Sequence, residues 1–417
     1  MKSMKSRLSA MMFIEWFIWG AWFVPLWQYL NHIGFSTSQI AWSYSSTSIA
    51  AIVSPVFVGV IADRYFSAQK VLSTLHFVGA ILLCFIARQK TFESFIPVLV
   101  VYTLLYMPTV ALTNSISFRN LENAGQDFPR IRVLGTIGWI FSGVCVGFVP
   151  SMLGFGDVST TSIPFMVAAL AALILGIFSL FLPDTPPENS GGKVDIGELL
   201  GLNALSMFKD RSFAVFALCS FLLCIPLAFY YQFANGYLTQ VGLKNATGWM
   251  SLGQFSEIFF MLALPFFLRR YGVKKVLLLG LVTAAVRYGI FMVAGTENML
   301  MVTLLFTGIL LHGASYDFYF ITAYIYTDEK SPSHMRTSAQ GLITLITMGL
   351  GALVGNQLGG ATLEYYTYAV AQGNETFNWF GVWGFGASII VFVTILFVFF
   401  FKDKEEYPKN VGVNVCH

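Results

Sequence analysis

The chain has 417 residues, of which 56% are hydrophobic, 16% are aromatic and only 11% are charged, and its formal net charge is +3. Soluble domains carry about a quarter charged residues, so the composition excludes an ordinary soluble protein. The apolar residues fall in runs of about 20, the length that a helix needs to cross the hydrocarbon core of a bilayer. We therefore expect an all-α integral membrane protein, because a helix satisfies its backbone hydrogen bonds within one segment.

About twelve runs reach membrane-crossing length. In chain order they are Leu8–Tyr29, Gln39–Ala62, Lys70–Ala87, Phe95–Ser117, Arg132–Leu153, Pro164–Leu182, Phe213–Leu238, Trp249–Leu268, Lys274–Ala294, Met299–Tyr326, Arg336–Leu363 and Phe377–Phe401.

The polar stretch 184–212 contains Pro-Pro and Gly-Gly and is expected to be a cytoplasmic linker, in which Ile196–Phe208 could form a short amphipathic helix. It separates an N-terminal six-helix half, residues 1–183, from a C-terminal half, residues 213–401. Residues 402–417 are expected to form a cytoplasmic tail.

The positive charges indicate the orientation in the membrane. If the N-terminus is cytoplasmic, nearly all of the 24 Lys and Arg residues lie in cytoplasmic segments or at their edges. Only Arg88, Lys90 and Lys244 fall in the opposite loops, and Arg287 lies inside a span. This asymmetry follows the positive-inside rule, so both termini are predicted to be cytoplasmic.

Several kinds of chemistry have no motif here. The five cysteines form no Cys-x-x-Cys pair, so neither a disulfide framework nor a zinc site is indicated. The sequence has no phosphate loop, no metal-ligand cluster and no nucleophile elbow. We expect no enzyme, no metal and no cofactor, and we expect transport driven by an ion gradient rather than by ATP.

Two six-helix halves joined by a cytoplasmic linker are the layout of the major facilitator superfamily, which binds substrate near the bilayer midplane. The loop after the second span reads from Gly59 to Asp63 and Arg64 and resembles that superfamily's Gly-x-x-x-Asp-Arg gate loop, with Phe66 where the following Gly would stand. Asp63 and Arg64 are therefore candidate gate residues; the alternative is an ordinary charged turn.

A charge at the centre of a membrane helix costs at least ~2.5–3.5 kcal/mol, so each one calls for an explanation. In the fifth span, Arg132, Thr136 and Trp139 fall on one helix face, where a cation, a hydroxyl and an indole suit a polar ligand with a ring. The alternative is that Arg132 extends to the cytoplasmic interface. In the eighth span, Gln254 and Glu257 share a face and could grip hydroxyls or a base edge; the alternative is an interhelical hydrogen bond.

The tenth span places His312 and Tyr316 on one face, and Asp317 lies about 140° around the helix from His312. A buried carboxyl such as Asp317 is a candidate proton carrier, and a static salt bridge is its alternative. Glu15, on one face with Trp19 in the first span, could be a second proton site or a buried partner of a basic residue.

The seventh span offers polar side chains near Pro226, where an interrupted helix is expected to line a cavity. The candidates there are Tyr231, Gln232 and Asn235.

The stretches Phe128–Gly138, Gln254–Glu257 and Tyr316–Phe318 resemble the bacterial nucleoside:proton symporters (NupG type) of the major facilitator superfamily. Further similar runs occur in the same order over nearly the whole chain; they are Tyr106–Thr109, Leu264–Gly272 and Ser338–Gly341.

The resemblance implies uptake of purine and pyrimidine nucleosides with protons across the cytoplasmic (inner) membrane of a bacterium. Its partners would be the nucleoside, protons and the lipid bilayer, with no nucleic acid and no obligatory protein partner. By match of motif, the binding or coupling positions are Arg132, Thr136, Gln254, Glu257 and Asp317.

This chain departs from the family at other positions of the site. Trp139 and Tyr316 stand where the family has Phe, His312 where it has Tyr, and Glu15 where it has Gln. In the seventh span, Ala228 and Tyr231 stand where it has Gln and Asn.

Two other functions stay open. The first is a proton-coupled sugar transporter of the same superfamily, because the run Pro183–Pro186 resembles the sugar-porter signature Pro-Glu-Ser-Pro-Arg without its Arg. The second is a non-transporting membrane receptor, although only the short linker and the tail could carry an output function.

Overall fold

The computed structural model describes residues 2–61, 66–187, 197, 201–332, 335–368 and 377–402. Within these ranges every regular element is a helix. The chain divides into two compact units. Unit 1 comprises residues 1–199 with 244–251, and unit 2 comprises residues 200–243 with 252–417.

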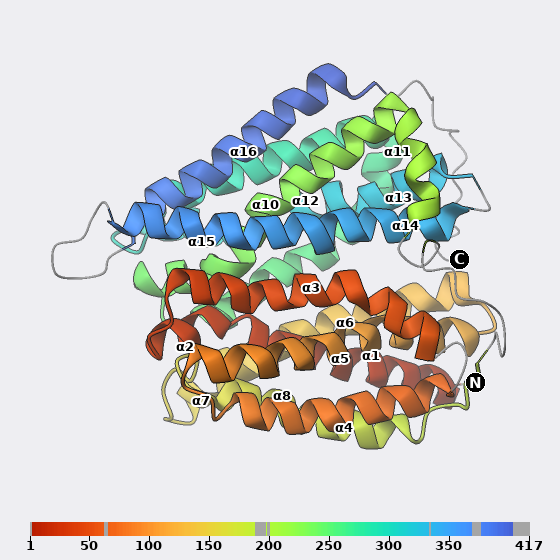
Figure 1. The fold of residues 1–417 in the computed structure, drawn as a ribbon. Helices are drawn as coiled ribbons and strands as arrows, with labels where there is room; N and C mark the ends of the chain where they lie inside the picture. Colours follow the sequence, from red (N-terminus) through yellow and green to blue (C-terminus); the bar gives the residue numbers. More distant parts are fainter. Residues whose placement is uncertain are drawn as a thin grey trace. The chain divides into compact units, whose positions relative to one another are not determined.

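Unit 1 is a bundle of long apolar helices with two short ones (Figure 1). Its helices are α1 (Lys2–Phe23), α2 (Leu26–His32), α3 (Thr37–Ile61), α4 (Ala68–Ile86), α5 (Phe92–Arg119), α6 (Ala124–Gly147), α7 (Val149–Met152) and α8 (Ile163–Ser179). The predicted span Leu8–Tyr29 is divided between α1 and α2 at Pro25, which has no N–H to continue the hydrogen-bond ladder.

Close packing of α1 against α6 positions the polar residues of unit 1. A Cβ atom on Gly138 would lie 2.1 Å from the backbone oxygen of Phe13, so only glycine allows this approach of the two helices. Helix α1 also packs against α5 and α8, while α4 packs against α5 and α8. The side chains of α1 that face inward are therefore surrounded by neighbouring helices.

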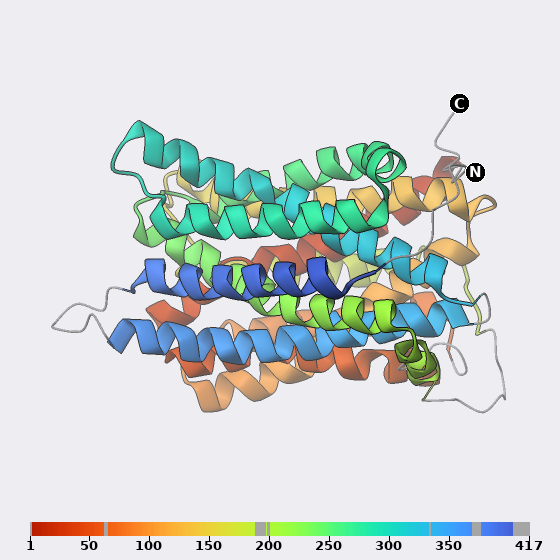
Figure 2. The same ribbon diagram turned by 90° about the horizontal axis from the view of Figure 1, so that it is seen from above.

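Unit 2 is also helical, and its long helix α10 lies beside α15 and α16 (Figure 2). Its elements are the 3₁₀ segment η1 (Leu202–Lys209), α10 (Arg211–Gln240), α11 (Ala246–Val293), α12 (Met299–Tyr316), η2 (Asp317–Ile321), α13 (Thr322–Lys330), α14 (Arg336–Thr344), η4 (Leu345–Gly351), α15 (Ala352–Tyr368) and α16 (Trp379–Phe400). The first residues of α11, 246–251, belong to unit 1. Gly272, with φ of 74°, divides α11 into two arms, which match the two spans predicted there.

Three local predictions are corrected. Pro226 does not interrupt the seventh span, because α10 continues through it from Arg211 to Gln240. The spans Met299–Tyr326 and Arg336–Leu363 are not uniform α-helices, since each contains a π-helical segment, η2 and η4. Within the predicted amphipathic helix Ile196–Phe208, residues 202–208 belong to the 3₁₀ segment η1; residues 196 and 198–200 lie outside the described ranges.

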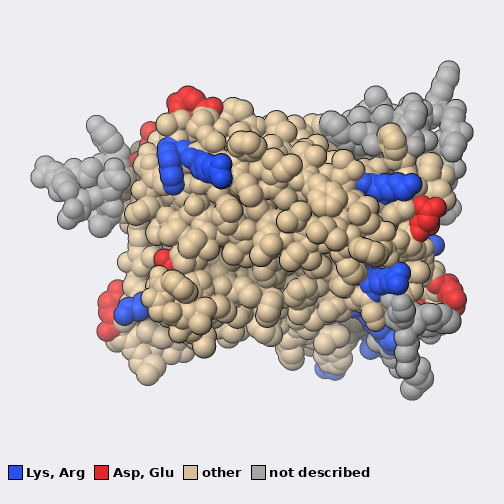
Figure 3. Space-filling view, turned by 90° about the horizontal axis from the view of Figure 1, so that it is seen from below, with Lys and Arg blue, Asp and Glu red and all other residues tan. Residues whose placement is uncertain are grey.

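The helices have the dimensions and surfaces of membrane spans. Among the described residues, nine helices are long and apolar enough to cross a bilayer. The twelve expected spans are reached when the two arms of α11 are counted separately and α3 and the shorter α8 are added to these nine helices. Large apolar side chains such as Ile81 and Leu262 are exposed on these helices, and most of the face in Figure 3 is formed by residues other than Lys, Arg, Asp and Glu. Such a surface suits contact with lipid.

Candidate functional site

The predicted polar face of α6 reaches α1. The guanidinium carbon of Arg132 lies 4.1 Å from the centre of the Trp16 ring, a cation–π distance. Arg132, Thr136 and Trp139 are all half-buried. The Arg132 side chain thus stacks on an aromatic ring of α1. An arginine that only extended to the cytoplasmic interface would not need this contact.

Trp139 belongs to a group of aromatic side chains that we call the N-terminal aromatic cluster. The cluster consists of Trp16, Trp19 and Phe23 of α1 with Trp139 of α6. The Trp139 ring centre lies 5.7 Å from that of Trp19, 6.3 Å from Phe23 and 6.4 Å from Trp16. These spacings are those of edge-to-face aromatic packing, so unit 1 presents indole surface next to a cation.

In unit 2, Glu257 of α11 meets His312 of α12. Oε1 of Glu257 lies 2.9 Å from Nε2 of His312, in an electrostatic contact without good hydrogen-bond geometry. Gly313 makes the approach possible, because a Cβ atom there would lie 2.4 Å from the Glu257 nitrogen. Ser256 Oγ also accepts a hydrogen bond of 2.9 Å from the Gly313 N–H. Gln254, one turn before Glu257, is nearly buried.

His312 links this pair to the tyrosines of α10 and α12. Its ring centre lies 4.8 Å from that of Tyr230, 6.1 Å from Tyr231 and 5.8 Å from Tyr316. The structure therefore brings together four of the predicted site residues, Tyr231, Glu257, His312 and Tyr316.

Three further predicted residues of unit 2 have fully buried side chains, namely Gln232, Asn235 and Asp317. Neither amide atom of Gln232 has a hydrogen-bond partner among the described residues. Asp317 interacts electrostatically with Glu257. It also begins the π-helical segment η2, and π-helical turns occur frequently at functional sites.

Arg287 of α11 extends the group around His312. Its guanidinium carbon lies 3.8 Å from the centre of the Tyr230 ring, and its Nε donates a hydrogen bond of 2.8 Å to the Gly308 oxygen. Arg287, Tyr230, His312 and Glu257 thus form one continuous contact series within unit 2.

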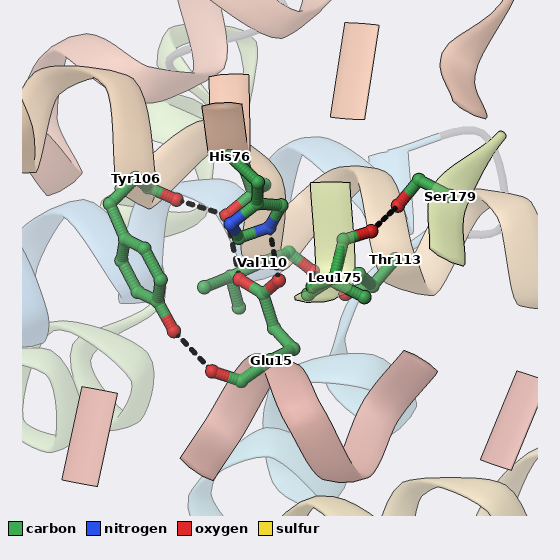
Figure 4. A network of polar contacts seen from close by, with 8 residues as sticks. Glu15, His76, Tyr106, Val110, Thr113, Leu175 and Ser179 are labelled. Atoms are coloured by element: carbon green, nitrogen blue, oxygen red, sulfur yellow. Dashed lines mark hydrogen bonds and ion pairs between the residues drawn. The ribbon is translucent and has the colours of Figure 1, made fainter. Parts of the chain in front are cut away.

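Glu15 lies in a separate polar group inside unit 1 (Figure 4). Its Oε2 is 2.8 Å from Nε2 of His76 on α4, and its Oε1 accepts a hydrogen bond of 2.6 Å from the Thr109 hydroxyl on α5. His76 is the residue that sequence reasoning missed. The available signal was a histidine within an otherwise apolar span.

The gate residues and a possible metal site complete the list of sequence expectations. The gate candidates Asp63 and Arg64 lie outside the described residues. Within the described ranges, no group of three or more His, Cys, Asp or Glu side chains is arranged to hold a metal ion.

Comparison with known proteins gives a consistent result. The family model described as nucleoside H⁺ symporter matches residues 1–406. The chain is 59% identical over 410 residues to the putative nucleoside transporter YegT of Escherichia coli (strain K12), covering 98% of this chain and 96% of the relative. It is 31% identical to the xanthosine permease of the same organism over 100% of both chains.

The fold agrees with these sequence relatives. A crystal structure of the nucleoside transporter NupG matches with a TM-score of 0.84 and 31% identity, covering 96% of this chain and 100% of that one. The chain therefore belongs to the nucleoside H⁺ symporter family, and it is a multi-pass membrane transporter of the major facilitator superfamily, not an enzyme.

Proposed function

We propose that the protein imports purine and pyrimidine nucleosides together with protons across the inner membrane of a bacterium, by alternating access and with both termini in the cytoplasm. Family membership supports nucleoside and proton as the transported species. The observation that carries the assignment of the site is the contact between Glu257 and His312, with Gln254 on the same face of α11 and Tyr231 and Tyr316 next to the imidazole.

These groups fit the chemistry of a nucleoside, which is uncharged and combines a flat base with ribose hydroxyls. A carboxylate and an amide one helical turn apart can accept and donate several hydrogen bonds to hydroxyls or a base edge. In this proposal Gln254 and Glu257 bind the nucleoside directly, and Gln232, Asn235 and His312 add further polar contacts. Trp139 and Tyr316 stack on the base, with Tyr231 beside it.

In unit 1 the proposed substrate groups are Arg132, Thr136 and Trp139. Arg132 is already held over Trp16, so its guanidinium can bind a ligand oxygen without losing its aromatic contact. Thr136 lies one turn further along the same face and offers a hydroxyl.

Proton coupling is assigned to carboxyl groups buried in the helices. Asp317 is fully buried and lies in the field of Glu257. Two nearby buried carboxyl groups resist being ionised together, so Asp317 is suited to bind and release a proton while Glu257 holds substrate. Glu15 is a third coupling candidate, and the proton is the coupling ion.

The remaining features of the proposal follow from sequence alone. Asp63 and Arg64 would form a cytoplasmic gate. The two halves would end and begin at residues 183 and 213, with the linker 184–212 and the tail 402–417 in the cytoplasm. No resident cofactor and no obligatory protein partner is part of the proposal.

Uptake by purified protein in liposomes tests this function. Labelled uridine should accumulate when the outside is acidic, and unlabelled uridine and adenosine should compete while hexoses should not. Glu257→Gln should lose most uridine binding, because a carboxylate is a stronger hydrogen-bond acceptor than an amide. The matched control is Glu297→Gln, which removes an exposed carboxylate and should bind as wild type.

Competition by hexoses but not by nucleosides would refute the substrate assignment. Equal uridine affinity in wild type and Glu257→Gln would instead remove Glu257 from the site while leaving the substrate class intact.

A further inference from the structure

The buried polar group of unit 1 contains two titratable side chains that face each other. Glu15 is fully buried and His76 is 2% exposed, and their side chains meet at 2.8 Å. Tyr106 of α5 donates a hydrogen bond of 2.6 Å to the backbone oxygen of Glu15, next to the Thr109 contact (Figure 4). Three helices, α1, α4 and α5, thus converge on one carboxyl group.

The hydrogen bonds of Thr109 allow two positions for a proton shared by Glu15 and His76. Its Oγ1 lies 2.6 Å from Glu15 Oε1 and 2.5 Å from the Tyr106 backbone oxygen, but a hydroxyl has one proton to donate. If Glu15 carries a proton on Oε1, it donates to Thr109, and Thr109 donates to Tyr106. If the proton is on His76 instead, imidazolium and carboxylate form an ion pair. Both arrangements hold one proton in addition to that of a neutral imidazole.

Loss of that proton would leave a buried carboxylate without a cation beside it. Among the described residues, the other titratable groups that interact with Glu15 are the hydroxyls of Tyr102 and Tyr106 on α5, and neither is a cation. Helix α8, which packs on α1 and α4, has no ionisable side chain from Ile163 to Ser179.

The remaining neighbouring helices also carry charged or titratable groups. On α6, Arg132 stacks on Trp16, and on α4, Lys70 and Cys84 lie about two turns from His76. An unpaired carboxylate in such surroundings is strongly disfavoured. Release of the proton therefore requires a rearrangement that hydrates or opens the α1–α4–α5 core.

We propose that Glu15 and His76 together form a second proton-binding site, which takes up and releases one proton in each transport cycle without touching the nucleoside. The proposal rests on proton symport as the function. Glu15 is adjacent to Trp16 and one turn before Trp19, both of the N-terminal aromatic cluster. A change of charge at Glu15 therefore acts on α1, the helix whose Trp19 contacts Trp139 of α6.

The proton-to-nucleoside ratio tests this site. Liposomes with the membrane potential clamped at zero are given a fixed pH gradient, and the steady-state ratio of internal to external uridine is measured. Each coupled proton multiplies that ratio about tenfold per unit of pH gradient, since one pH unit is equivalent to a tenfold concentration ratio. Glu15→Gln and His76→Gln should each lower the ratio about tenfold per pH unit and retain uridine binding. The control Tyr106→Phe removes a hydroxyl that stays protonated, and its ratio should match wild type.

The double variant Glu15→Gln/His76→Gln keeps a polar side chain at both positions and removes both titratable groups, and it serves as the test if a single variant does not fold. An unchanged accumulation ratio in the folded variants would overturn the second proton site. Absence of proton-driven accumulation in wild type would instead overturn the proposed symport itself, so the two failures are distinguishable.

Discussion

We expect that Gln232 on α10 lowers the stability of the ligand-free protein and contributes to nucleoside binding. Its side chain is fully buried, and neither its Oε1 nor its Nε2 has a hydrogen-bond partner among the residues described. Methionine has a similar length and no strong hydrogen-bonding atom. We therefore expect Gln232→Met to stabilise the ligand-free protein and, at the same time, to weaken nucleoside binding.

The magnitude follows from the cost of burying an unpaired amide, about 1–3 kcal/mol in protein mutational data. Gln232→Met should raise the free energy of unfolding by a similar amount, about 1–3 kcal/mol. If the amide binds the nucleoside, the variant also loses a net hydrogen bond of about 0.5–1.5 kcal/mol, which corresponds to a roughly 2- to 12-fold rise in Kd for uridine.

Thermal unfolding of the purified protein in detergent, with and without uridine, measures both effects. Gln240 on the same helix is the matched control, because its Oε1 accepts a hydrogen bond of 2.9 Å from Trp379 Nε1. Gln240→Met should lower the Tm and leave the shift by uridine unchanged. A lower Tm for Gln232→Met, or an unchanged uridine Kd, would refute the reasoning.

Three further outcomes are expected. Trp139→Ala should raise the uridine Kd several-fold and Trp139→Phe much less, because a stacked ring contributes about 0.5–1.5 kcal/mol beyond its buried area; equal Kd values in a binding titration would remove Trp139 from the site. Asp317→Asn should retain binding and counterflow exchange but lose at least about tenfold in accumulation per unit of pH gradient, and wild-type accumulation would place coupling elsewhere. Asp210 caps α10 by accepting a hydrogen bond of 3.0 Å from the Phe213 N–H, so Asp210→Ala should destabilise the protein by about 1 kcal/mol in thermal unfolding and Asp210→Asn hardly at all.

The number and order of the helices could be predicted from the sequence, because each apolar run has the length that the bilayer requires. The break at Gly272 was also evident from the charged turn around it. Local irregularities were harder to predict. Pro25 separates α1 from α2, whereas Pro226 lies within a continuous α10, and the sequence does not distinguish the two.

Several residues of the candidate site were recognisable because a carboxylate within an apolar span is costly. Glu257 and Asp317 were identified in this way, but their partners were not. The His312 contact depends on the close approach of α11 and α12 at Gly313.

His76 was missed for a related reason. It is 61 residues from Glu15 in the chain, and nothing in the sequence indicates that the two side chains meet. The roles assigned to all these residues, and the limits of the two halves, stay predictions.

Proton entry driven by nucleoside tests the central claim most directly. Liposomes that contain the purified protein and an internal pH indicator begin with equal pH on both sides, and uridine is added outside. The account predicts internal acidification that saturates with uridine concentration and disappears when a protonophore is present. Uridine entry without any change of internal pH, or acidification by a hexose but not by uridine, would contradict it.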